Sequence, residues 1–279
     1  MIQQIIYGIL YGGVFALAAI GMSMMFGIVG LTNLAHGEFI ILAAFLSSVL
    51  CTALGCSPFL TLIITVPVMF IVGFILQKVL INYVMGKGAN AALLVTFGLS
   101  FILKDGMLQI FSADSRRMVV AFQSANIRIS DSVVIPVLYL VVCLIGVAVI
   151  VILHLFMSKT YVGQSIRATS DDKVAAQLVG VNIKNVTAVA MGIALATAAV
   201  SGLTLGMPWP FYATSGSGYL LIAFGVVVLG GMGSMIGALV GGVIFGLAQV
   251  LGGSNWGVFI SYIILLIFLA VRPQGLFKK

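Results

Sequence analysis

The hydrophobic residues of this chain are grouped into long continuous runs, and short polar or glycine-rich segments separate the runs. Several runs reach the roughly 20 residues that an α-helix needs to cross the hydrocarbon core of a membrane. They do not alternate between apolar and polar residues, as the strands of a membrane β-barrel would. We therefore predict an all-α polytopic membrane protein with about eight membrane helices, including short or broken ones. The predicted spans are 3–29, 39–53, 59–83, 91–111, 132–157, 186–206, 219–250 and 255–271.

An unusual polar segment, residues 30–38, separates the first two runs. Its sequence, Gly-Leu-Thr-Asn-Leu-Ala-His-Gly-Glu, brings Thr32, Asn33, His36 and Glu38 together in a chain that is only 7% charged. A polar cluster of this kind is costly wherever it touches lipid. Two interpretations follow. The segment is either a short connector in water at the membrane face, or a helix break inside the protein that lines a pathway.

A second break, rich in glycine, divides the run at 219–250. It reads Gly-Gly-Met-Gly-Ser at 230–234, and glycines recur at intervals of four residues at 233, 237 and 241, at 242 and 246, and at Gly8 and Gly12. Such spacing lets another helix or a substrate approach the backbone closely. Paired interruptions in the two halves of a chain indicate a transport site between structural repeats, so we expect two pseudo-symmetric halves. The simpler alternative is a glycine-rich packing face without a pathway.

The residues of the two breaks are the candidate pathway residues. We expect Asn33 to offer a polar partner to a substrate, and the second break to offer backbone groups from the opposite half of the protein. For Glu38, the alternative is that it only caps or braces the helix that begins near residue 39. The candidates from the breaks are Thr32, Asn33, His36, Glu38, Gly230, Gly231 and Ser234.

The composition leaves no room for a soluble domain. The chain has 279 residues, 62% of them hydrophobic, and a mean hydropathy of +1.28, so we treat 1–279 as a single membrane domain. The net charge of +7 does not indicate nucleic-acid binding, because the basic residues lie in connectors and in the tail and form no stripe. The first run lacks the basic start and the cleavage site of a signal peptide, and we interpret it as a retained span.

The basic residues indicate which side of the membrane each connector faces. Nine of them lie in the connector 159–184, in the C-terminal tail and at Lys78 and Lys87, whereas three lie in the connector 112–131. Because cytoplasmic loops carry an excess of Lys and Arg, we expect the C-terminus in the cytoplasm and the N-terminus outside, in a bacterial inner membrane. Within 112–131 we expect short strands at 118–122 and 127–129.

Isolated polar and sulfur-containing residues have ordinary explanations. Lys104 is expected to extend to the membrane interface and Asp105 to lie close to water, with a pathway role as the alternative. The three cysteines form no metal-ligand spacing with the two histidines. We interpret them as small membrane hydrophobes, with a disulfide between Cys51 and Cys56 near a helix end as the alternative.

The polar connector 159–184 is predicted to hold a short cytoplasmic helix at 171–179. Ser170 is the expected N-cap, Asp171 and Asp172 complement the positive end of the helix, and Gly180 closes it. A helix of this length is too short to be stable alone, so it needs a partner surface. The alternative is a surface helix that lies on its own bundle.

The same connector carries a family motif. Its Ala175-Ala176-x-x-x-Gly180 resembles the EAA---G signature of ABC-importer permeases, with Val174 in place of the usual Glu. Further stretches resemble the branched-chain amino acid permease family, of the shorter, high-affinity leucine/isoleucine/valine type. They are residues 30–39, 96–100 (Thr-Phe-Gly-Leu-Ser), 228–234 with 237–242, and the ending 272–277 (Arg-Pro-Gln-Gly-Leu-Phe).

The resemblance implies a permease subunit, and not an enzyme, that imports branched-chain amino acids. The implied partners are a second homologous permease, two cytoplasmic ATPases that bind the coupling helix, and an extracytoplasmic substrate-binding protein. ATP and Mg²⁺ would be bound by the ATPases and no cofactor by this chain, which has no G-x-x-x-x-G-K-[ST] loop. The resemblance adds Thr96 and Gly98 to the pathway candidates, and it implies ATPase coupling by Arg167, Asp171, Ala175, Ala176 and Gly180.

Three other functions compete with this one. Permeases for urea, amides or a sugar share much of the same pattern. A proton-coupled secondary transporter would use His36 and Glu38 as a relay, but it would not need a docking helix. A non-transporting membrane scaffold would not need polar breaks in both halves.

Overall fold

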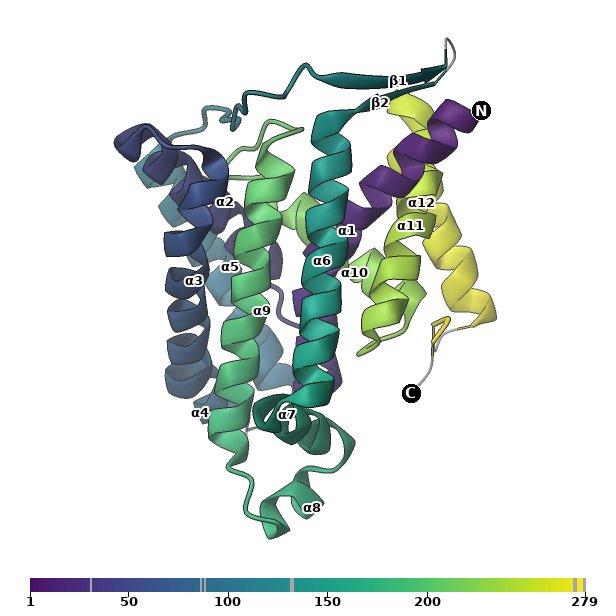
Figure 1. Ribbon diagram of the computed structural model, residues 1–279. Helices are drawn as coiled ribbons and strands as arrows, with labels where there is room; N and C mark the ends of the chain where they lie inside the picture. Colours follow the sequence, from purple (N-terminus) through teal and green to yellow (C-terminus); the bar gives the residue numbers. More distant parts are fainter. Residues whose placement is uncertain (31, 86, 88, 131–132, 273–274, 278–279) are drawn as a thin grey trace.

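The computed structural model is a bundle of long helices with a β-hairpin at one end (Figure 1). It describes residues 1–30, 32–85, 87, 89–130, 133–272 and 275–277. Within these ranges, seven helices are long and apolar enough to cross a membrane, and one bent helix pair can form an eighth span. The prediction of an all-α polytopic membrane protein is therefore confirmed.

The elements follow the predicted order, with shifted ends. The helices are α1 (Ile2–Val29), α2 (His36–Leu54), α3 (Leu62–Leu76), α4 (Asn82–Met85), α5 (Ala89–Phe111), α6 (Val137–Lys159), α7 (Tyr161–Asp171), α8 (Lys173–Leu178), α9 (Ile183–Gly206), α10 (Gly216–Gly230), α11 (Met235–Leu251) and α12 (Gly253–Val271). A 3₁₀ turn, η1 (Pro58–Thr61), precedes α3, and a π-helical turn, η2 (Gln77–Ile81), follows it. The strands are β1 (Asn126–Ser130) and β2 (Val133–Pro136).

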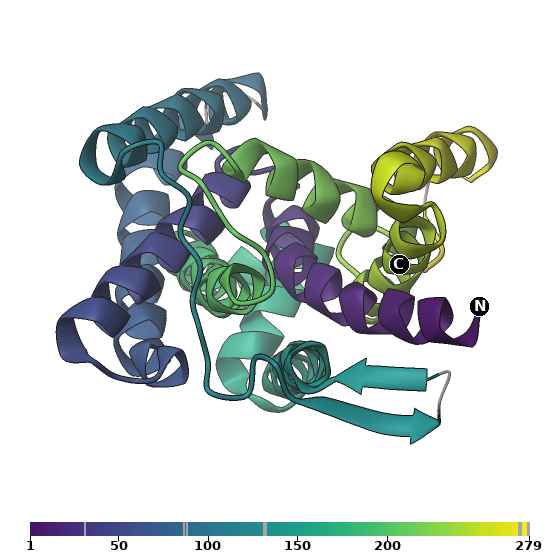
Figure 2. The same cartoon turned by 90° about the horizontal axis from the view of Figure 1, so that it is seen from above.

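The helices α1 and α9 form the centre of the bundle. In each of them, 72% of the most apolar stretch is buried inside the protein, against 17% in α5 and in α12. Figure 2, which looks down the bundle, shows α1 crossing it obliquely while α9 and α6 are seen nearly end-on. The outer helices therefore present apolar side chains such as Ile102 and Leu266 to lipid.

Glycines bring α1 and α11 into direct backbone contact. A Cβ at Gly12 would lie 2.5 Å from the Cα of Val243, and a Cβ at Gly242 would lie 2.5 Å from the carbonyl oxygen of Gly12. The second glycine row, at Gly237 and Gly241, faces α10 instead. The predicted small-residue packing faces are thus confirmed, and each row has its own partner helix.

The connector before α6 differs from the prediction. The strand expected at 127–129 lies within β1, which pairs with β2, but 118–122 forms no strand. The span expected at 132–157 begins only at Val137. Residues 133–135 are β-branched and precede Pro136, which disfavours helical geometry in the residue before it, so they form a strand.

The connector 159–184 also differs from the prediction. α7 extends to Asp171, so Ser170 lies inside a helix and is not an N-cap. Asp172 is the N-cap of α8, because its side chain accepts hydrogen bonds from the backbone N–H groups of Val174 and Ala175 at 2.8 and 3.0 Å. Gly180 closes the segment as predicted, with a φ of 87°.

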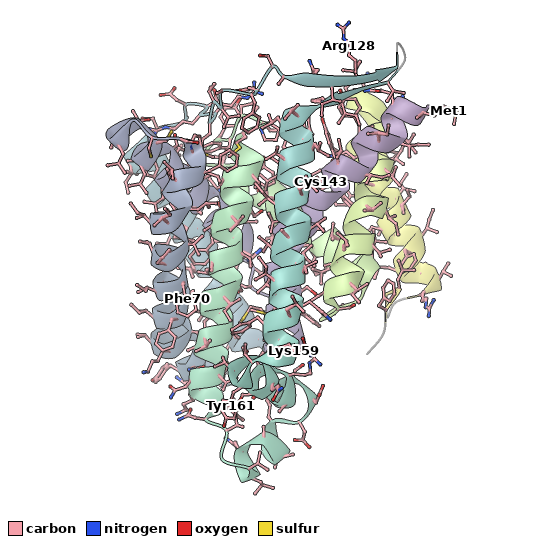
Figure 3. The ribbon with its side chains drawn as sticks, viewed as in Figure 1. Met1, Phe70, Arg128, Cys143, Lys159 and Tyr161 are labelled. Carbon is pink, nitrogen blue, oxygen red and sulfur yellow. The ribbon has the colours of Figure 1, made fainter. Side chains whose placement is uncertain are left out.

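The two ends of the bundle carry different elements. Figure 3 shows Arg128 on the hairpin at one end, and Lys159 and Tyr161 at the other, where α7 and α8 lie. The N-terminus belongs to the hairpin end, since Gln3 donates a hydrogen bond to the carbonyl of Val134 at 2.5 Å. Each half of the chain holds one interrupted helix pair, α1–α2 and α10–α11. The pseudo-symmetry of the two halves stays a prediction.

Candidate functional site

The first break lies deep in the bundle. His36, the first residue of α2, donates a hydrogen bond from Nε2 to the carbonyl oxygen of Ala18 at 3.0 Å. Ala18 precedes the last residue of α1, Val29, by eleven positions, or about 16 Å along the helix axis. This distance is about half the thickness of a hydrocarbon core, which is about 30 Å. The start of α2 therefore lies inside the bundle, and the position of the break within the membrane stays a prediction.

Most polar groups of this break are used to hold the backbone. The Oδ1 of Asn33 accepts a hydrogen bond from the backbone N–H of Ala35 at 3.0 Å, which stabilises the turn into α2. The backbone N–H of Leu34 donates to Oγ1 of Thr96 at 3.4 Å. Thr32, Asn33 and Thr96 also line one cavity of about 20 Å³, together with Met191 of α9. Asn33 and His36 therefore have structural partners of their own.

Glu38 differs from its neighbours because its side chain is buried without a matching partner. Only 4% of the residue is exposed, and its Oε2 has no hydrogen-bond partner in the described part of the chain. The carboxylate lies directly against Gly216, the first residue of α10, and occupies the space that a Cβ would need there. A Cβ at Gly37 would likewise collide with the carbonyl of Gly216. Two helix N-termini thus meet at one carboxylate, which their positive ends stabilise.

A cavity of about 220 Å³ opens beside this carboxylate, and Lys104 of α5 shares it with Glu38. Both charged residues line the cavity, yet no ion pair joins them within the described residues. The ammonium of Lys104 lies 5.1 Å from the ring centroid of Phe101. The alternative assignment of Lys104, a pathway role, is the one that this geometry favours. The residues that line the cavity are Leu34, Glu38, Phe97, Ser100, Phe101, Lys104, Ser217 and Leu220.

The second break lies elsewhere and does not face the first. α10 and α11 are bent by 116° at residues 231–234. The break contacts the end of α1, where Gly233 lies against Gly27, and the tail, where the N–H of Phe277 donates to the carbonyl of Gly230 at 3.2 Å. A Cβ at Gly231 would also meet the backbone of Phe277. The expected supply of backbone groups from this break to a substrate stays a prediction, and the N-terminus of α10 lies against Glu38.

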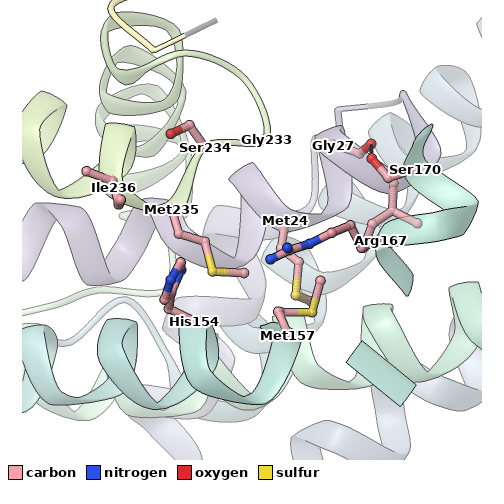
Figure 4. Close-up of a pocket in the computed structure, with 11 residues that line it drawn as sticks. Met24, Gly27, His154, Met157, Arg167, Ser170, Gly233, Ser234, Met235 and Ile236 are labelled. Carbon is pink, nitrogen blue, oxygen red and sulfur yellow. Dashed lines mark hydrogen bonds between the residues drawn. The ribbon is translucent and has the colours of Figure 1, made fainter. Parts of the chain in front are cut away.

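The second break instead lines a separate cavity of about 180 Å³ (Figure 4). Arg167 of α7 and His154 of α6 point into this space from the side opposite Ser234. Ser234 uses its hydroxyl to cap α11, accepting from the N–H of Gly237 at 2.9 Å. Ser170 donates to the carbonyl of Gly27, so α7 is bonded to the end of α1. This cavity belongs to the end of the bundle that carries α7 and α8.

The predicted coupling residues have unequal exposure. Ala175 and Gly180 are exposed, whereas Ala176 is only 3% exposed and packs against its own chain. The apolar surface of α8 and its end comes from Val174, Leu178 and Val179, which are 66%, 84% and 79% exposed. Exposed apolar residues outside the membrane spans indicate a surface for a protein partner.

Two residues of the site around Glu38, Gly216 and Ser217, were not among the candidates. They belong to a Gly-Ser-Gly triplet at the start of α10, which lies outside the predicted spans. For Lys104, a pathway role was only the alternative interpretation. Lys104 follows Ser100 by four residues and Thr96 by eight, which puts all three on one face of α5, and this spacing was the available signal. Gly98 lies on the exposed face of α5 with nothing within 4 Å of an added Cβ, away from the cavity.

The cysteines and histidines form no metal site in the described part of the chain. All three cysteines are free thiols, and Cys51 donates a hydrogen bond to the carbonyl of Cys56 at 2.9 Å.

Interrupted membrane helices beside a cavity lined by a buried carboxylate and a lysine are typical of one class of protein, the membrane transporters. The chain belongs to the family described as branched-chain amino acid transport system / permease component, whose model matches residues 4–271. The predicted family is thereby confirmed. A member of this family is a permease subunit of a transport system and not an enzyme.

Curated relatives match along the whole chain. The high-affinity branched-chain amino acid transport system permease protein BraD of Pseudomonas aeruginosa is 29% identical, over 100% of this chain and 96% of its own length. LivH of Escherichia coli strain K12, which carries the same description, is also 29% identical with the same coverage. The probable branched-chain amino acid transport permease protein LivH of Methanocaldococcus jannaschii is 25% identical over 96% of this chain. No solved structure matches the chain significantly.

The contact between Glu38 and Gly216 generates a test of the site. Gly216→Ala should lower the free energy of unfolding by about 1–3 kcal/mol, because the added methyl group displaces the carboxylate. Gly218→Ala is the matched control, since an added Cβ there meets nothing within 4 Å. Thermal unfolding of the purified protein measures both. Equal midpoints for the two variants would mean that the close contact is not required.

Proposed function

We propose that this chain is the membrane-spanning permease subunit of an ATP-driven importer for branched-chain amino acids. The family and the names of the relatives support the substrate class. The single observation that carries the proposal is the cavity between the membrane helices that Glu38 and Lys104 line. A packing-only role would not require two charged side chains there.

The alternative of a proton relay through His36 and Glu38 is not favoured by the geometry. His36 uses Nε2 for the carbonyl of Ala18, and no hydrogen bond joins it to Glu38 in the described part of the chain. Residues two positions apart on a helix also do not face each other.

A second permease subunit is proposed to cover the face formed by α5 and α10. Phe97 and Phe101, which line the Glu38 cavity, are about half exposed in the single chain, so the cavity reaches its surface. Lipid at this position would contact charged side chains at high cost. A homologous subunit on this face would enclose the cavity between the two permeases.

The remaining partners are proposed for the two ends of the bundle. Two ATPases, with their own ATP and Mg²⁺, would bind α8 on the cytoplasmic side. The C-terminus would lie on the same side of the membrane. A substrate-binding protein would dock outside, at the hairpin and the N-terminus. Exposed Arg128 and the turn at 207–215 lie at that end, where Arg117 donates hydrogen bonds to the carbonyls of Met207 and Pro208 at 3.0 and 3.1 Å.

Uptake by the reconstituted complex tests the function itself. Proteoliposomes that contain this chain, its partner permease and the ATPases should accumulate leucine, supplied with the binding protein, only when ATP is hydrolysed. A proton uncoupler should leave uptake unchanged. Uptake that follows the proton gradient, or that urea or a sugar competes away, would contradict the proposal.

Docking of the ATPases generates a second prediction. Leu178→Asp should reduce the amount of ATPase that copurifies by roughly tenfold, since losing a central contact of an interface costs about 2 kcal/mol or more. Val119→Asp is the control, because it puts the same charge at a 69% exposed apolar residue at the opposite end of the bundle. Normal copurification of the ATPases with the Leu178→Asp variant would show that α8 is not part of the interface with them.

Labelling of single cysteines tests the orientation. Ser124 lies in the outer connector and Gln177 lies on α8, and both are exposed. In a chain without its three native cysteines, Ser124→Cys should react with a membrane-impermeant thiol reagent in intact cells. Gln177→Cys should react only after the membrane is opened. The reverse pattern would invert the proposed topology.

A further inference from the structure

Glu38 is the polar group of the first break that the fold does not use completely. Asn33 holds the turn and His36 joins α2 to α1, each through a hydrogen bond to the protein's own backbone. The Oε2 of Glu38 has no such partner, although the residue is more than nine-tenths buried. A buried carboxylate without a hydrogen bond is costly, so an additional donor is expected where Glu38 lines the cavity.

The cavity beside Glu38 offers opposite charges at separate positions. The carboxylate comes from the first turn of α2 and the ammonium of Lys104 from α5. Since they form no direct ion pair, a ligand has room to interact with both. The hydroxyl-bearing residues Ser100 and Ser217 line the same space. Charged and polar groups therefore converge on the cavity from three helices.

The rest of the cavity wall is apolar. Leu34, Phe97, Phe101 and Leu220 complete the lining. The volume of about 220 Å³ is below the range of about 300–1,000 Å³ that is typical of pockets for drug-sized ligands. The cavity thus suits a small ligand with one apolar group and two charges of opposite sign.

We propose that this cavity binds the zwitterionic head group of an α-amino acid during its passage through the membrane. The ligand ammonium donates hydrogen bonds to the carboxylate of Glu38, and Lys104 donates to the ligand carboxylate. The apolar side chain of the ligand contacts Phe97, Phe101 and Leu220. This assignment rests on the proposed transport function and names the residues that recognise its substrate.

The charges balance in this arrangement. Glu38 and Lys104 together carry no net charge, and neither does the ligand, so binding adds no net charge to the buried site. A ligand that lacks either charged group would leave Glu38 or Lys104 without a partner, which is unfavourable in a buried site. The site therefore selects for the complete zwitterion and tolerates variation of the apolar side chain.

A protection experiment on the complete complex tests this site. Ser217→Cys places a thiol in the cavity lining at an exposed residue, in a chain whose three native cysteines are replaced by alanine. In proteoliposomes, leucine should slow the reaction of this thiol with a small thiol reagent. At the same concentration, 4-methylpentanoate, which lacks the ammonium, and 3-methylbutylamine, which lacks the carboxylate, should not.

Variants of Glu38 and Lys104 test whether these two residues bind the charged groups of leucine. Glu38→Gln and Lys104→Met should each raise the leucine concentration for half-protection by roughly tenfold or more, as expected when a hydrogen bond to a charged group is lost. Asp105→Asn is the matched control, because this neighbouring carboxylate is exposed and does not line the cavity. It should leave protection unchanged. If Glu38→Gln does not assemble, Lys104→Met alone decides the result.

Two results would overturn the proposal. One is equal protection by leucine and by the two analogues, and the other is unchanged protection in the assembled charge variants. ATP-driven leucine uptake by the unmodified complex, measured in parallel, separates this inference from the proposed function. Uptake without charge-dependent protection rejects the site alone, whereas absence of ATP-driven uptake rejects the transport function.

Discussion

The helices α2 and α10 begin at the same point inside the protein, and the carboxylate of Glu38 lies between their N-termini. The end of each helix is equivalent to about half a positive charge, so two ends together match about one carboxylate. Without Glu38, two positive ends would meet in a medium that screens them poorly. The glycines at positions 37 and 216 make this approach possible, because any side chain there would collide with the partner helix.

This arrangement explains why the polar residues of the break have different roles. Asn33 and His36 form hydrogen bonds within the protein and specify where α1 ends and α2 begins. Glu38 stabilises the meeting of the two helices and also lines a cavity with Lys104. A polar residue inside the membrane is thus not by itself a pathway residue, and the distinguishing feature is whether its hydrogen bonds are already satisfied.

The continuous apolar runs predicted the membrane helices and their order, because helix length is set by the thickness of the bilayer. The glycine spacing predicted faces for close helix packing for a similarly local reason, but not that α1 and α11 pack against each other. The partner of Glu38 was not predictable in this way. Gly216 is far from Glu38 in the sequence, and only the path of residues 207–215 back into the bundle brings α10 to it. Ser170 was misassigned because Asp172, two residues later, is an equally good cap and the chain uses that one.

The hydrogen bond between Ser170 and Gly27 joins α7 to the central helix α1. α7 adjoins α8, the surface that the ATPases are proposed to contact. From Gly27, α1 runs as one unbroken helix to Ala18, whose carbonyl holds His36 at the start of α2. Between these two contacts, Ser23 of α1 also donates a hydrogen bond to the carbonyl of Ser234 in the second break at 3.4 Å. One helix, α1, therefore contacts α7, the second break and the turn before Glu38 at successive positions along its length.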